Sequence, residues 1–175
     1  EYYKIENYTY AGLNEYSGLS HGKIKGIKRP TYLTNPLVPH RLYKYNPNMK
    51  IIAILRDPVK RFYSAYHHLV KSGYLAPITI DEFIDACINN PKLMEKNART
   101  KSLFEYGLYA KGLYNYIQLF PMENIKIVLI EDLNQDREKF FKDLYKFLGV
   151  ESYAPKISKK SRPMKSISNQ LRITI

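Results

Sequence analysis

Two short apolar runs are the clearest strand signals in the chain. Residues 50–55 are Lys-Ile-Ile-Ala-Ile-Leu, and residues 124–130 are Asn-Ile-Lys-Ile-Val-Leu-Ile. Continuous apolar runs of this length, rich in β-branched residues, are typical of parallel strands that are buried on both faces. We therefore expect both segments to be buried strands.

Several other segments repeat apolar residues three and four positions apart, which indicates amphipathic helices. The best defined follows Asp57, which can cap it, and begins with Pro58, whose missing N–H needs no partner there. It runs to about residue 72, where Gly73 ends it. Further helices are expected at 7–16, 38–45, 79–88, 106–120 and 136–148, the last closed by Gly149. Strands that alternate with helices predict an α/β fold with a parallel sheet.

Composition narrows the class of protein without choosing a function. The 175 residues are 45% hydrophobic and 25% charged, which suits one globular domain. The net charge of +12 favours an anionic partner such as a nucleic acid, an acidic membrane face, a phosphorylated or sulfated molecule, or an acidic sugar. The single cysteine, Cys87, excludes an internal disulfide and a multi-cysteine zinc site, and is expected to pack in the core.

The junction between the first strand and its helix has the features of an anion site. Ligands of open α/β sheets bind beyond the carboxyl ends of the strands, and a helix N-terminus favours phosphate. Arg56 can make a two-pronged contact with phosphate oxygens, and Ser64 can add a hydroxyl donor. Lys60 and Arg61 raise the local positive field. A capped helix with an exposed arginine and an unremarkable serine explains the same pattern, so both interpretations stay open at this point.

The segment Arg-Asp-Pro-Val-Lys-Arg-Phe-Tyr-Ser-Ala-Tyr (56–66) resembles the 3′-phosphate-binding motif of sulfotransferases that use PAPS (3′-phosphoadenosine 5′-phosphosulfate). In that motif the first arginine and the serine bind the donor's 3′-phosphate. Residues 28–47 resemble the stretch before the motif in heparan-sulfate-type members. The rest of the likeness lies in residues 107–109, 120–121, 125–133 and 147–149. The resemblance is best over 28–150 and implies a P-loop-NTPase-like fold, in which helices flank a parallel sheet.

The resemblance implies transfer of the sulfuryl group from PAPS to a hydroxyl or amine, on a carbohydrate, with PAP (adenosine 3′,5′-bisphosphate) as the product and no metal. It assigns cofactor binding to Arg56 and Ser64, and to a basic loop that closes over the nucleotide, with Lys159, Lys160 and Arg162. Lys28 matches a lysine that lines the active site, and Glu1 stands near the position of the catalytic base, about two residues out of register. A solvated loop lysine and a soluble basic tail are the alternatives for Lys28 and the loop.

One family feature is missing from the pattern. The family begins with a strand and a glycine-rich loop whose lysine binds the 5′-phosphosulfate, whereas residues 18–23 are one residue short of such a loop and follow no convincing strand. We therefore expect residues 1–175 to be a single sulfotransferase domain that is N-terminally incomplete, with roughly 50 residues upstream. Little sulfuryl transfer is expected from this chain alone.

Two other functions remain as alternatives. One is a catalytically inactive nucleotide-binding domain, as the missing loop would suggest. The other is a polyanion or nucleic-acid binding module, although the basic residues do not cluster on one helix and no nucleic-acid motif is present. No apolar run reaches the ~20 residues of a membrane span. The lone cysteine fits a bacterial or viral cytoplasmic enzyme, and the alternative is a catalytic domain in the Golgi lumen.

Overall fold

The computed structural model describes residue 24 and residues 26–153. The chain divides into two units, residues 1–31 and residues 32–175, which we describe separately. The described residues of the first unit, 24 and 26–31, are exposed and form no helix or strand. The helix predicted at 7–16 lies outside the described residues.

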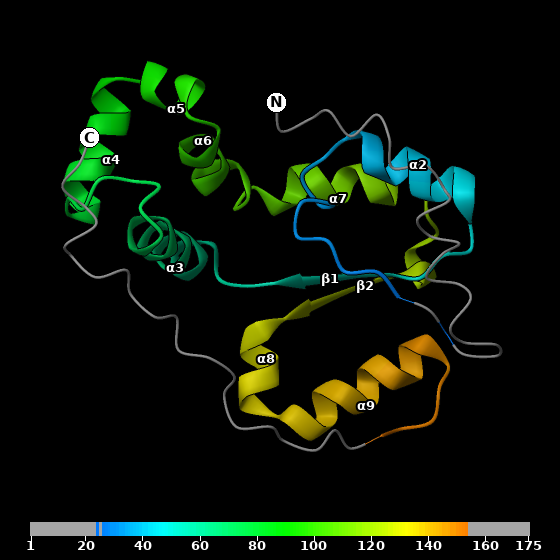
Figure 1. The fold of residues 1–175 in the computed structure, drawn as a ribbon. Coiled ribbons are helices and arrows are strands. Elements are labelled where there is room, and N and C mark those ends of the chain that lie inside the picture. Colours follow the sequence, from blue (N-terminus) through cyan, green and yellow to red (C-terminus); the bar gives the residue numbers. More distant parts are fainter. Residues whose placement is uncertain (1–23, 25, 154–175) are drawn as a thin grey trace. The chain divides into compact units, whose positions relative to one another are not determined.

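The second unit contains a parallel pair of strands, β1 (Ile51–Leu55) and β2 (Ile125–Leu129) (Figure 1). Their register places Ile51 opposite Ile125 at one end and Leu55 opposite Leu129 at the other. Both strands begin and end within one residue of the predicted bounds. The prediction of a parallel sheet is confirmed, and the carboxyl ends of the two strands meet at one edge.

Burial of the strands differs from the prediction. Ile54 is 58% exposed and Ile127 is 45% exposed, whereas Ala53 and Val128 are buried. Burial on both faces is therefore wrong for the part of the sheet that the structure describes. An apolar run shows that a strand is suited to burial on both faces, but the exposure of each side chain depends on how many strands and helices pack against that strand. The described sheet has only two strands, so parts of both remain exposed.

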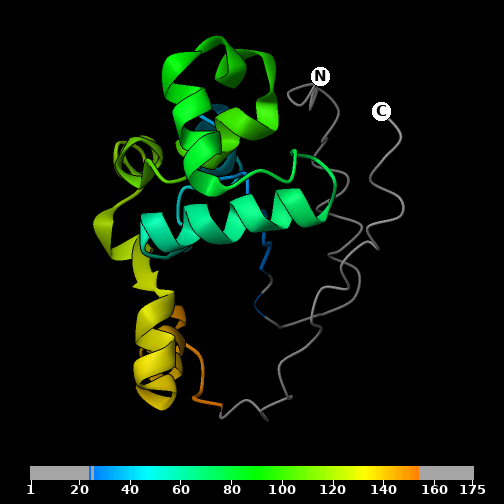
Figure 2. The ribbon, with the colours of Figure 1, turned by 90° about the vertical axis from the view of Figure 1, so that its left-hand side faces the viewer.

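Helices make up most of the rest of the second unit, as Figures 1 and 2 show. They are α2 (Leu37–Tyr45), α3 (Pro58–Lys71), α4 (Ile80–Asn89), α5 (Lys92–Lys96), α6 (Ala98–Glu105), α7 (Tyr109–Ile117), α8 (Ile130–Gln135) and α9 (Arg137–Leu148), with a 3₁₀ turn at Met122–Asn124. The helix expected at 106–120 is shorter than predicted and corresponds to α7. Helices α5, α6 and α8 were not predicted.

Local capping explains where the predicted helices begin and end. The Asp57 side chain accepts the Lys60 N–H at 2.7 Å, which caps α3 with Pro58 at its first position. Thr79 and Glu82 form a reciprocal capping box at the start of α4. Gly149 ends α9 with a φ of 73°, a left-handed conformation that glycine adopts without a steric penalty.

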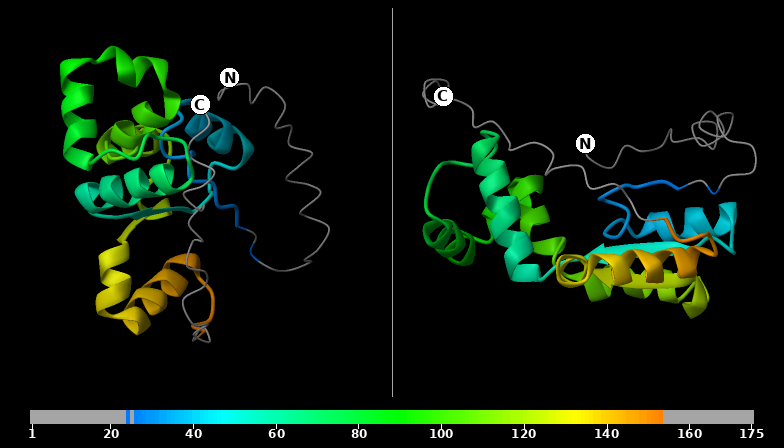
Figure 3. Two further views of the ribbon diagram at one scale, coloured as in Figure 1. Left: turned by 60° about the vertical axis from the view of Figure 1, so that its left-hand side comes forward. Right: turned by 90° about the horizontal axis from the view of Figure 1, so that it is seen from below.

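One apolar core lies between the strands and helices α2 and α7. Its buried residues are Val38, Tyr116, Phe120 and Ile125. Helices α8 and α9 lie on the opposite side of the strand pair, as the views in Figures 1 and 3 agree. The strands are thus placed between helices, as expected for an α/β fold.

A second apolar core lies among helices α3, α4 and α6 (Figure 2). It consists of Tyr66, Phe83, Cys87 and Leu103, of which Cys87 is only 2% exposed. Core packing of the cysteine is confirmed. The hydroxyl of Tyr66 donates to the Ile78 carbonyl at 2.7 Å, so this buried aromatic ring keeps a partner for its polar end.

Within the described part of the chain, we find no helix with the length and apolar character that crossing a bilayer requires.

Candidate functional site

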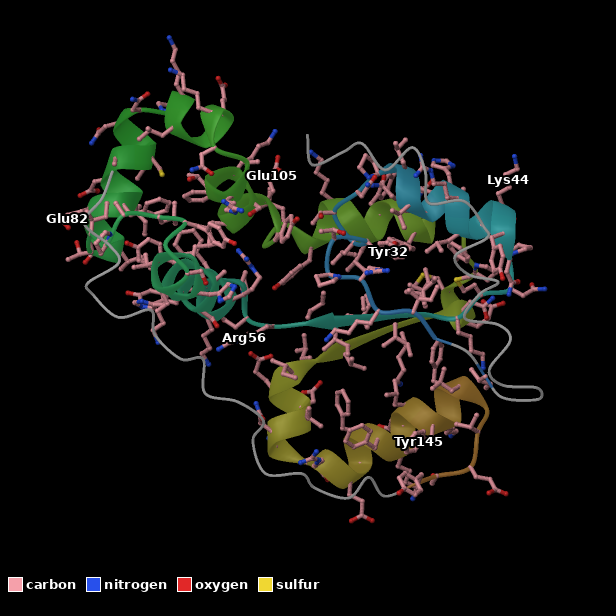
Figure 4. The ribbon with its side chains drawn as sticks, viewed as in Figure 1. Tyr32, Lys44, Arg56, Glu82, Glu105 and Tyr145 are labelled. Atoms are coloured by element: carbon pink, nitrogen blue, oxygen red, sulfur yellow. The ribbon has the colours of Figure 1, made fainter. Side chains whose placement is uncertain are left out.

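Arg56 lies where β1 leads into α3, as labelled in Figure 4. It is exposed, and it directly precedes Asp57, the residue that caps the 14-residue helix. The sequence predicted this arrangement, because the strand, cap and helix all follow from local pattern. An arginine is therefore held at the carboxyl end of a parallel strand and beside a helix N-terminus, where backbone N–H groups favour an anion.

A pocket of about 390 Å³ opens at this junction. Both strand ends contribute to it, together with the first residue of α7. The lining residues are Leu55, Arg56, Asp57, Pro58, Lys60, Tyr109, Leu129 and Glu131. The pocket thus joins segments that are more than fifty residues apart along the chain, as expected of a site at the edge of a parallel sheet.

Two cations in this pocket are available to an anion. Neither the Arg56 nor the Lys60 side chain makes an ion pair or hydrogen bond with any described residue. Unpaired cations that line a concave site attract a charged ligand, and the guanidinium can contact two phosphate oxygens at once.

Ser64 lies on α3, one helical turn after Lys60, and its side chain is exposed. Residues four apart share one face of a helix, so Ser64 follows Lys60 along the same face. It does not line the pocket itself. The structure therefore places Ser64 on the helix face that continues from the pocket, and its predicted contact with phosphate stays a prediction.

Glu131 joins the two strand ends. Its Oε1 accepts the backbone N–H of Asp57 at 3.1 Å, across 74 residues of sequence. Its Oε2 is withdrawn from solvent and has no hydrogen-bond partner among the described residues. The sequence offers one signal for this residue, because an acidic side chain directly after a buried strand lies at the edge of the sheet where ligands bind.

Arg61 has a different role from the one predicted. One terminal nitrogen of its guanidinium donates to the Leu103 carbonyl at the end of α6, and its Nε has no partner among the described residues. Burial lowers the pKa of Arg61, with an opposing effect from nearby Tyr109. Arg61 is absent from the pocket lining, so Lys60 is the neighbouring cation that faces the site.

The other predicted site residues lie in the first unit or outside the described residues. Lys28 is exposed in the first unit. Glu1, Lys159, Lys160 and Arg162 lie outside the described residues. His67 and His68 are exposed on α3, and the described residues hold no cluster of three or more potential metal ligands.

Comparison with known proteins gives a consistent family. The sulfotransferase domain model matches residues 15–172. Mouse heparan sulfate glucosamine 3-O-sulfotransferase 5 is 31% identical over 101 residues, which is 58% of this chain and 29% of that protein. The Drosophila melanogaster bifunctional heparan sulfate N-deacetylase/N-sulfotransferase is 28% identical over 150 residues, which is 85% of this chain and 13% of that protein.

A solved structure agrees with these matches. A sulfotransferase from Alicyclobacillus acidocaldarius superposes with a TM-score of 0.71 and 26% identity, covering 89% of this chain and 61% of that chain. The chain spans less than a third of the length of the mouse and fly relatives. The family model covers nearly the whole chain, and the α/β fold agrees with it. The chain belongs to the sulfotransferase domain family.

Proposed function

We propose that this chain is a PAPS-dependent sulfotransferase domain that transfers a sulfuryl group to a hydroxyl or amine of a carbohydrate. The observation that carries the proposal is the pocket at the carboxyl ends of β1 and β2, where Arg56 and Lys60 stand unpaired beside a capped helix N-terminus. Such a pocket suits a phosphate group. In this proposal the ligand there is the 3′-phosphate of PAPS.

Each proposed residue has a defined part in the reaction. Arg56 and Ser64 bind the 3′-phosphate, and Lys159, Lys160 and Arg162 bind the nucleotide from the basic segment. Lys28 faces the charge of the sulfate or acceptor, and Glu1 acts as the base for the acceptor hydroxyl. Sulfuryl transfer is an in-line displacement, so positioning the donor and stabilising developing charge supply most of the acceleration.

A carbohydrate acceptor is supported by the relatives. Two of them are named for heparan sulfate, and human carbohydrate sulfotransferase 15 is 26% identical over 136 residues, which is 69% of this chain and 23% of that protein. The net charge of +12 is compatible with an acidic glycan, because a positive surface attracts a polyanion.

Calorimetry with two nucleotides tests the proposal. Wild-type protein should bind PAP more tightly than adenosine 5′-monophosphate, which lacks the 3′-phosphate. A charged hydrogen bond contributes about 1.5–3 kcal/mol, so Arg56→Ala should weaken PAP binding at least tenfold and leave the monophosphate nearly unaffected. The matched control is Lys71→Ala, which removes an exposed cation from the last turn of the same helix.

Two outcomes would count against the proposal. Equal affinity for the two nucleotides in the wild-type protein would contradict recognition of the 3′-phosphate. Tight PAP binding by the full-length protein, without sulfuryl transfer from PAPS to heparan-type acceptors, would instead favour a catalytically inactive nucleotide-binding domain.

A further inference from the structure

Glu131 is one of two acidic residues that line the pocket; the other, Asp57, uses a carboxylate oxygen to cap α3. It follows β2 directly, lies in the first turn of α8, and lines the same pocket as Arg56 and Lys60. Its Oε1 already has a role, because it accepts the Asp57 N–H at 3.1 Å and so holds the turn after Arg56. That role occupies one of its two oxygens.

The second oxygen lacks a donor within the part of the chain that the structure describes. Glu131 Oε2 is shielded from solvent and accepts no hydrogen bond from any described residue. A buried polar atom without a hydrogen-bond partner has lost its hydration with no compensating bond. This desolvation costs free energy, and the cost is larger for a charged group. A donor supplied by the ligand would remove this penalty.

The neighbouring cations do not supply that donor. Neither Arg56 nor Lys60 forms an ion pair with Glu131, although all three side chains line one pocket. No described residue donates to Glu131 Oε2, so a ligand bound at Arg56 would have to bring the donor itself. A nucleotide with a 3′-phosphate carries such a donor on the adjacent ring carbon, the ribose 2′-hydroxyl.

We propose that Glu131 Oε2 accepts a hydrogen bond from the ribose 2′-hydroxyl of the nucleotide whose 3′-phosphate Arg56 binds. The inference rests on the proposed function and deepens it. Arg56 and Glu131 together recognise a 3′-phosphate beside a free 2′-hydroxyl. An acidic residue after a strand binds a ribose 2′-hydroxyl in other α/β nucleotide sites, by the same carboxylate chemistry. Glu131 is thus a specificity-determining residue that discriminates against 2′-deoxy nucleotides and against the 2′-phosphate isomer.

Calorimetry with PAP, 2′-deoxyadenosine 3′,5′-bisphosphate and adenosine 2′,5′-bisphosphate tests the inference. In the wild-type protein we expect the deoxy compound to bind about tenfold more weakly than PAP, as loss of a charged hydrogen bond implies. The 2′,5′ isomer should bind more weakly still, because its phosphate would face Glu131. In Glu131→Ala the deoxy compound should bind about as tightly as PAP, so the ratio of deoxy to ribo affinity should rise from about 0.1 to about one.

The ratio of deoxy to ribo affinity distinguishes two roles of Glu131: contact with the 2′-hydroxyl, and stabilisation of the turn after Arg56. Glu131→Ala also removes the hydrogen-bond partner of the Asp57 N–H. This loss should weaken the binding of both nucleotides by the same factor, so it cancels in the ratio of their affinities. Asp132→Ala, which changes the exposed acidic neighbour, is the control and should keep the wild-type ratio. If the alanine variant does not fold, Glu131→Gln keeps an oxygen for the Asp57 N–H while its amide nitrogen cannot accept from the hydroxyl.

The outcomes are distinct. If wild-type protein binds the deoxy compound as tightly as PAP, and both more tightly than adenosine 5′-monophosphate, the inference is overturned while the proposed function stands. If PAP and the monophosphate bind equally, the proposed function fails first. A deoxy-to-ribo ratio that stays at its wild-type value in Glu131→Ala, or in Glu131→Gln where the alanine variant does not fold, would also overturn the inference, because another group would then contact the hydroxyl.

Discussion

Buried hydroxyl groups in the apolar cores show how single side chains stabilise this fold. Tyr116 is 3% exposed, and its hydroxyl donates to the Tyr32 carbonyl at 2.9 Å, across 84 residues of sequence. This bond satisfies a polar atom inside the core formed by α2, α7 and β2. Burial raises the pKa of Tyr116, with a smaller contribution from nearby Tyr32.

We predict that Tyr116→Phe lowers the free energy of unfolding by about 1 kcal/mol, the usual loss when one partner of a buried hydrogen bond is removed. Urea unfolding followed by circular dichroism measures the change. Tyr114→Phe is the matched control, because Tyr114 lies on the same helix and is 62% exposed. Equal stability of the Tyr116 variant and wild type would show that this hydrogen bond contributes nothing net.

The raised pKa of Tyr116 also gives this difference a pH dependence. The native state holds the phenolic proton more tightly than the unfolded state, whose tyrosines titrate near pH 10. The stabilising contribution is therefore complete below about pH 10 and is lost as the pH rises toward the native pKa. The stability gap between wild type and Tyr116→Phe should narrow over that alkaline range.

At the scale of elements, one glycine controls how closely α7 approaches the rest of its unit. A Cβ built at Gly112 would lie 2.3 Å from the Leu33 carbonyl oxygen and 3.0 Å from the Leu33 side chain. Real Cβ atoms do not approach a backbone oxygen so closely, so any larger residue would push the helix away from residues 32–34. The close packing therefore requires glycine here, against its low helix propensity.

We predict that two substitutions in opposite directions on α7, glycine to alanine at 112 and alanine to glycine at 110, both destabilise the protein. Gly112→Ala should destabilise the protein by roughly 1–3 kcal/mol, because the clash outweighs the gain in helix propensity. Ala110→Gly, at an exposed position of the same helix, should also destabilise, by about 1 kcal/mol, so alanine is preferred at 110 and glycine at 112. Thermal unfolding of both variants measures the effects, and a stabilised Gly112→Ala protein would contradict the packing.

At the scale of the whole molecule, we expect the net positive charge to assist the binding of an anionic ligand. The net charge is +12, and the segment with Lys159, Lys160 and Arg162 carries part of it. We propose that this segment binds the phosphates of the nucleotide and thereby excludes water from the reacting sulfate.

We predict that PAP at saturating concentration increases hydrogen-exchange protection at residues 156–165 as well as at 56–64. Replacing Lys159, Lys160 and Arg162 with alanine should raise the dissociation constant of PAP, with an effect that shrinks at high salt because ions screen exposed charges. Protection at 56–64 alone would identify the segment as a plain basic tail and remove these residues from the site.

Local pattern predicted the elements that carry the site. The apolar runs marked β1 and β2, and Asp57, Pro58 and Gly149 marked helix ends, because strand formation and capping depend on residues within a few positions of one another. Arg56 could therefore be placed at a strand–helix junction in advance. Helix α6 was not predicted because its sequence, ARTKSLFE, has little amphipathic pattern. Its cap, Asn97, is of a residue type that is also common in loops, so it did not mark a helix start by itself.

The sequence by itself thus determined the family, the strands with their parallel pairing, and the position of Arg56. Tertiary structure alone decided that Glu131 meets the Asp57 N–H, that Arg61 donates to the Leu103 carbonyl, and that Ile54 stays exposed. The physical reason is the distance along the sequence over which each kind of interaction acts. Capping and periodicity act within a turn or two, whereas these contacts join residues 42 to 74 apart and depend on strand register and helix placement.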